Sequence, residues 1–76
     1  MDINEFIENF AEIFDEVNSE ELSAETVFRN IDEWSSLNAL SVLALSNELF
    51  DVELTAQELR NAQTIGDIYN TITSKL

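Results

Sequence analysis

Apolar residues recur at steps of three and four between residues 3 and 17 of the chain. Steps of this size place side chains on one face of an α-helix, because each residue turns the helix by about 100°. Asp2, with Glu5 three residues later, has the spacing of an N-terminal capping box. The pattern predicts a first helix whose apolar face packs on a core and whose other face is acidic. The apolar face consists of Ile3, Phe6, Ile7, Phe10, Ile13, Phe14 and Val17.

Three further helices are predicted beyond a long connection. Residues 18–35 hold a few apolar anchors and are expected to form a loop with short turns, whereas residues 36–50 predict a second helix. Thr55 and Thr64 each precede an acidic residue by three positions, as in a capping box that opens a helix. The helix after Thr55 is expected to be short, and Gly66 should slightly weaken the first turn of the last one. We therefore expect an all-α fold, a small four-helix bundle of three longer helices and one short helix, with a long loop between the first and second helices.

The second predicted helix is apolar on two faces. One face, expected to pack in the core, consists of Ala39, Val42, Leu43, Ser46, Leu49 and Phe50. On another side Leu37, Leu40 and Ala44 form a strip beside Ser36, and Glu48 is the single acid within the helix. Either the helix is buried all round, or the strip is exposed and docks a partner. Exposure of the strip distinguishes the two alternatives.

Composition restricts the chemistry that the chain can perform. Its 76 residues suffice for one core, so residues 1–76 are expected to form one domain. The chain has no cysteine and no histidine, and therefore lacks a thiolate ligand, a nucleophilic thiol and the usual base near neutral pH. We expect no metal site and no enzymatic activity from this chain alone.

The net charge of −13, from 16 acids and 3 bases, argues against nucleic acid or an anionic membrane as a partner. Acids interrupt the first ten residues, so the pattern does not predict a signal peptide. The longest apolar-rich run, residues 37–45, is too short to span a bilayer. We expect a cytoplasmic monomer.

Two adjacent serines, Ser35 and Ser36, stand where the second helix is predicted to begin. Serine is among the best N-cap residues, and either of them can accept a hydrogen bond from the first turn. The second hydroxyl lies beside the apolar strip with no base to activate it, which suits modification better than nucleophilic attack. A phosphodiester attached there would also lie near the positive end of the helix dipole.

The stretch Ser35-Ser36-Leu37 resembles the Asp-Ser-Leu motif that opens the second helix of acyl carrier proteins. The likeness covers nearly the whole chain, through "SLNALSVLALSNELF", "DVELTAQEL" and "TIGDIY" in family order. It implies one acyl-carrier-like domain, a phosphoprotein in which a phosphopantetheinyl transferase attaches 4′-phosphopantetheine from coenzyme A to Ser36. The chain would then hold acyl groups as thioesters for fatty-acid, polyketide-like or related biosynthesis, with acyl-loading and acyl-processing enzymes as partners.

The chain departs from that family in several places. Ser35 replaces the acid of the motif, residues 32–34 replace a glycine-containing turn, and Asn38, Ser41 and Asn47 stand where acids are frequent. The resemblance implies that the thiol comes with the arm, so the absence of cysteine is consistent with it.

The docking surface is expected to comprise Leu37, Leu40, Ala44 and Glu48, extended by Ile65 if the last helix lies alongside. Two alternatives to an acyl carrier stay open. One is an aminoacyl or peptidyl carrier, and the other is an unmodified helical interaction module in which Ser36 only caps the helix.

Overall fold

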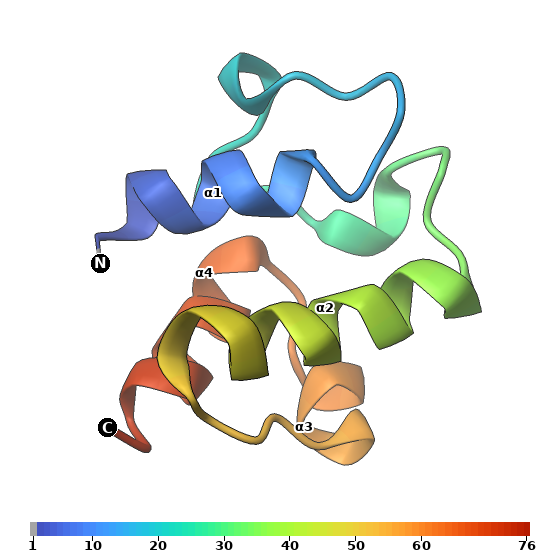
Figure 1. Cartoon of the computed structure of the whole chain (residues 1–76). Coiled ribbons are helices and arrows are strands. Elements are labelled where there is room, and N and C mark those ends of the chain that lie inside the picture. The colour runs from blue at the N-terminus through green and yellow to red at the C-terminus, as the bar shows by residue number, and fades with distance from the viewer. Residues whose placement is uncertain (1) are drawn as a thin grey trace.

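Four α-helices make up most of the computed structural model, which describes residues 2–76 (Figure 1). The helices are α1 (Ile3–Ala11), α2 (Ser36–Phe50), α3 (Ala56–Asn61) and α4 (Ile65–Thr73), with the 3-10 helices η1 (Ser19–Glu21) and η2 (Phe28–Asn30) between α1 and α2. No strand forms within residues 2–76, so the expectation of an all-α fold is confirmed. In that part of the chain, no helix has the length and apolar character needed to cross a membrane.

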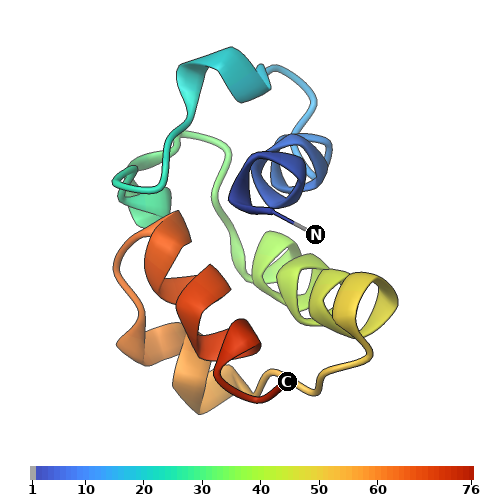
Figure 2. The same cartoon turned by 90° about the vertical axis from the view of Figure 1, so that its left-hand side faces the viewer.

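The helices enclose one core. Helix α1 packs against α2 and α4, and α3 lies against α4 at the end of the molecule away from η1 (Figures 1 and 2). The Cα radius of gyration is 11.1 Å, close to the value of about 11 Å expected for a compact domain of this length.

Helix α1 is shorter than the apolar pattern predicts, since it ends at Ala11 and does not continue to Val17. The next backbone N–H groups, at 13–14, bond to carbonyls three residues back instead of four. Those at 15–16 donate to the carboxylate of Glu33, at 3.0 Å each, so a side chain from beyond the helix takes the place of helical acceptors. The prediction of a longer first helix was therefore wrong, because a tertiary contact competes with the helical bonds.

The core is built mainly from aromatic and β-branched side chains. The rings of Phe10 and Phe28 pack edge to face at 6.5 Å, and Trp34 from the connection packs edge to face on Phe28 at 4.8 Å. Aromatic pairs in this range contribute roughly 0.5–1.5 kcal/mol beyond their buried area. The fully buried side chains are Phe6, Phe10, Phe28, Val42, Ser46, Ile65, Ile68 and Ile72.

Local side-chain caps determine where the helices begin, as at α1, α3 and α4. The carboxylate of Asp2 accepts the backbone N–H of Glu5 at 3.0 Å at the start of α1. Thr55 and Thr64 each form a reciprocal capping box, as predicted, and thereby begin α3 and α4. The sequence-based bounds of α2, Ser36 to Phe50, are also confirmed.

Candidate functional site

The two serines have different roles at the start of α2. Ser35 is the N-cap residue, with extended backbone angles, and its Oγ accepts the backbone N–H of Asn38 at 3.3 Å. The side-chain amide of Asn38 donates in turn to the backbone carbonyl of Glu33. These bonds join the segment before the helix to its first turn and determine where Ser36, the first helical residue, is placed.

The Ser36 side chain is exposed, and its hydroxyl makes no hydrogen bond within residues 2–76. The capping role that the interaction-module alternative gives to Ser36 was therefore wrong, because Ser35 occupies that position. A hydroxyl that no protein group needs is free to be modified without loss of a structural bond.

The apolar strip of α2 is exposed. Leu37 is 72% exposed and Leu40 is 63% exposed, and Ala44 one turn further on is exposed as well. On the core side Val42 and Ser46 are fully buried, and the Ser46 hydroxyl donates to the carbonyl of Val52 at 2.8 Å. Of the two alternatives for this helix, the structure therefore matches the exposed strip. Two neighbouring exposed leucines thus lie beside an exposed serine at the start of α2.

The strip extends along α2 toward Glu48, which is exposed. Glu48 lies 12 positions after Ser36, a distance of about 18 Å along the helix at 1.5 Å per residue. The side chains that the sequence predicts for docking on α2 are thus all accessible, although they span most of its length.

Ile65 does not extend the strip. Its side chain is 0% exposed and belongs to the core. The backbone places it there, because the N–H groups of Ile65 and Gly66 donate to the carbonyls of Thr26 and Ala24, at 3.1 and 2.8 Å. The first turn of α4 is thereby covered by the connection between α1 and α2, so the docking role expected for Ile65 was wrong.

A cavity of about 270 Å³ opens beside Ser36, between α2 and α3. Its lining combines apolar side chains with two arginines. It is lined by Arg29, Trp34, Ser36, Ala39, Leu40, Leu43, Ala56, Leu59 and Arg60. The sequence analysis did not identify either arginine as part of a site. Their rarity could have indicated one, because the chain has only three bases and a net charge of −13.

Arg29 connects η2 with the end of α3. Its Nη1 donates to the carbonyl of Ala62 at 2.7 Å, and its Nη2 donates to those of Leu59 and Arg60, at 3.0 and 2.8 Å. The guanidinium also lies over the ring of Phe28, 4.8 Å from its centre. The last carbonyl groups of a helix lack N–H donors from a following turn, and the Arg29 guanidinium donates to these carbonyls instead.

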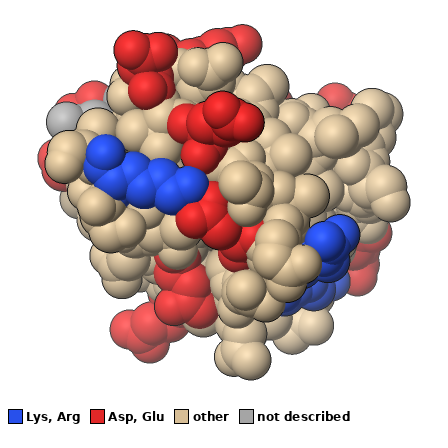
Figure 3. Space-filling view, turned by 90° about the horizontal axis from the view of Figure 1, so that it is seen from below, with Lys and Arg blue, Asp and Glu red and all other residues tan. Residues whose placement is uncertain are grey.

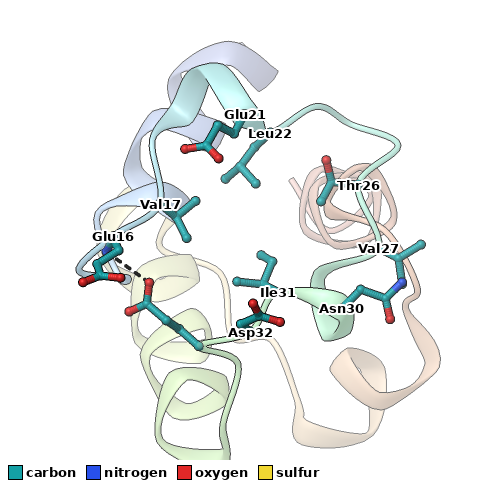
Figure 4. A pocket seen from close by; sticks show the side chains of 10 residues that line it. Glu16, Val17, Glu21, Leu22, Thr26, Val27, Asn30, Ile31 and Asp32 are labelled. Atoms are coloured by element: carbon teal, nitrogen blue, oxygen red, sulfur yellow. Dashed lines mark hydrogen bonds between the residues drawn. The ribbon is translucent and has the colours of Figure 1, made fainter.

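A larger cavity, of about 520 Å³, lies elsewhere, beside η1 and η2 (Figure 4). Carboxylates stand around an apolar floor that includes Val17, Leu22 and Ile31. The acids are Glu16, Glu21, Asp32 and Glu33. Such a ring of negative charge disfavours a phosphate or any other anion, in contrast to the cavity beside Ser36.

Among the described residues, no group of three or more carboxylate, imidazole or thiolate side chains is arranged to hold a metal ion. At the other end of α2, Asp51 ends the helix in the left-handed conformation, with φ of 56°.

Comparison with models of known protein families gives no match for this chain, and comparison with curated proteins gives none either. The function is therefore inferred from the sequence motif and from the geometry around Ser36.

Proposed function

We propose that this chain is an acyl carrier, which holds acyl groups as thioesters on a 4′-phosphopantetheine arm attached to Ser36. The observation that carries the proposal is the division of roles between the two serines. Ser35 caps α2, which leaves the Ser36 hydroxyl exposed and unbonded within the described residues. The motif resemblance selects the same residue.

The surroundings of Ser36 suit the attachment step. The Ser36 oxygen would form the new bond to phosphorus, while the pyrophosphate bond of coenzyme A breaks and adenosine 3′,5′-bisphosphate leaves. The transferase would accept the hydroxyl proton, since this chain has no histidine to do so. When bound, the arm supplies the thiol that the chain lacks.

The exposed strip supports a carrier that must be recognised by several enzymes. Leu37 and Leu40 adjoin the attachment point, so a partner that covers them would receive the arm directly. Tethering raises the effective concentration of the cargo at the docked enzyme, without chemical activation. We infer that the transferase and the acyl-loading and acyl-processing enzymes all use this surface.

We also infer the finer arrangement expected of the family. This comprises a four-helix bundle with a long connection before α2, a single domain over residues 1–76, a monomer, and a place in the cytoplasm. The isolated bridge between Val27 and Thr64 supports only the placement of the long connection, because it ties the connection to the start of α4.

Labelling tests the function. The unmodified protein is incubated with coenzyme A and a broad-specificity transferase, and its intact mass is measured. We expect one arm per chain in the wild type and in Ser35→Ala, and none in Ser36→Ala. An unlabelled wild-type protein, beside a known carrier that is labelled in the same tube, would refute the proposal.

An unmodified interaction module is the second candidate, because the exposed Leu37 and Leu40 would serve such a role equally well. The labelling experiment separates it from a carrier. An aminoacyl or peptidyl carrier would label in the same way, and only the enzyme that loads the arm distinguishes it.

A further inference from the structure

We propose that Arg29 and Arg60 bind the phosphodiester that joins the arm to Ser36, and so position the first atoms of the arm at the cavity between α2 and α3. This inference rests on the proposed modification of Ser36. It adds two positioning residues that the motif does not contain.

Positive charge is distributed unevenly over the molecule. The chain has three bases and 16 acids, yet two of the three bases line the cavity that Ser36 also lines. The third base, Lys75, is engaged elsewhere, with the carboxylate of Glu58 and, at 2.9 Å, with the carbonyl of Glu53. Basic atoms accordingly show at two separate places in Figure 3, with acidic atoms between them. A phosphodiester on Ser36 would thus lie where this acidic chain gathers its cations.

Arg29 is held in place before any anion arrives. Three of its five N–H donors are bonded to carbonyls at the end of α3. Little side-chain freedom therefore has to be lost on binding, which is the main cost of recruiting a long flexible base. Its charge is thereby fixed at the end of α3.

Arg60 stands in the last turn of α3 and keeps donors available. Its Nη2 donates to the side-chain oxygen of Gln57 at 3.1 Å, and its other donors have no partner within residues 2–76. A guanidinium presents these donors as a planar fork that matches two phosphate oxygens. Arg60 can thus close on the phosphodiester while Arg29 supplies a fixed charge.

The apolar lining of the cavity suits the pantetheine part of the arm, beyond its phosphate. Leu40, Leu43 and Leu59 line the cavity together with the two arginines. A ligand with one charged end and an uncharged chain matches this combination of surfaces, and a pantetheine arm has that composition. The acidic cavity beside η1 offers no such combination.

The test compares modified wild-type protein with two variants that lose one positive charge each. Arg60→Gln removes the proposed contact, and Lys75→Gln is the matched control with the same net charge. Complete modification is first verified by intact mass. Arg29→Gln is avoided, since it would release the end of α3, and the Nε–Hε signal of Arg29 is followed in the wild type instead.

We expect the Nε–Hε signals of Arg29 and Arg60 to move when the wild type is modified. The phosphorus-31 relaxation of the phosphodiester should report a more mobile group in Arg60→Gln and an unchanged one in Lys75→Gln. Full modification with unmoved arginine signals, or equal loosening in both variants, would overturn this inference alone. A wild-type protein that cannot be modified would overturn the proposed function as well.

Discussion

Ser35 and Ser36 are neighbours whose hydroxyls have different roles. This difference predicts that their alanine variants differ in the free energy of unfolding. Ser35→Ala removes the bond to the amide of Asn38, and loss of such a cap costs about 1 kcal/mol. Ser36→Ala removes no bond within the described residues and should change the free energy of unfolding by less than half as much. Urea unfolding followed by circular dichroism measures both variants. If Ser36→Ala were the more destabilised, the cap would be misassigned.

Asp67 is a second single residue whose contribution to the stability of the fold can be measured, because this contribution depends on pH. The backbone N–H groups of Gln63 and Thr64, at 3.0 and 3.1 Å, hold the pKa of its carboxyl below the ordinary value of 3.8. A group whose pKa is lowered by folding stabilises the fold above its unfolded pKa, and this contribution disappears as the pH falls through the folded value.

We therefore expect Asp67→Asn to be less stable than the wild type at pH 7, and the difference to shrink as the pH falls below the ordinary pKa of 3.8 and to vanish once the folded carboxyl is protonated. Unfolding by urea at constant ionic strength and several pH values measures it. A difference that stays constant with pH would show that shape, rather than charge, distinguishes the two side chains.

Among the helices, α4 begins where the connection approaches it closely. Glycine is a poor helix former, so helix propensity alone predicts that Gly66→Ala gains about 1 kcal/mol. A Cβ at this position would, however, lie 2.9 Å from the backbone oxygen of Ala24, which also accepts the Gly66 N–H at 2.8 Å.

We expect Gly66→Ala to lower the midpoint of thermal unfolding, because a backbone atom cannot yield as a flexible side chain can. Asn70→Ala, at an exposed position of the same helix, is the control and should leave the midpoint equal or higher. A Gly66→Ala protein more stable than the wild type would mean that the connection shifts at little cost.

Helix α2 should engage partners through its leucines more than through its acid. Apolar side chains at the centre of an interface are worth roughly 1–3 kcal/mol each, whereas rim charges mainly alter the association rate. Given the proposed function, Leu40→Ala should raise the Kd for a cognate enzyme more than Glu48→Gln does. The measurement is titration calorimetry across a salt series. Steep salt dependence with Leu40→Ala near wild type would instead place the contact on charges such as Asp32 and Glu33.

For the molecule as a whole, self-repulsion of acids opposes the compact state. Nine of the 16 acids lie within residues 1–25, where there is no base. At physiological ionic strength the Debye length is about 8 Å, which screens much of their repulsion. We expect the thermal midpoint to rise from low to physiological concentrations of sodium chloride, and equally with potassium chloride. An unchanged or lower midpoint would contradict this account.

Features whose causes lie within one helical turn could be predicted from the amino-acid sequence. The caps at Thr55 and Thr64 and the limits of α2 depend on residues three or four positions apart, so all of them were predicted. The apolar face of α1 was predicted in the same way, from the spacing of its apolar residues, but the residue at which the helix ends was not. Glu33, far along the chain, takes the amides that would have continued the helix.

Which surfaces are free, and which distant residues meet, depends instead on packing between elements. Helical periodicity leaves open whether the apolar side chains of Leu40 and Ile65 are covered. Packing decides this, since the connection and the core bury Ile65 completely, whereas Leu40 is 63% exposed. Likewise, Arg29 and Arg60 stand 31 positions apart and meet at the cavity of Ser36 because Arg29 binds the end of α3. Burial and proximity depend on what packs against an element, and periodicity describes only the element itself.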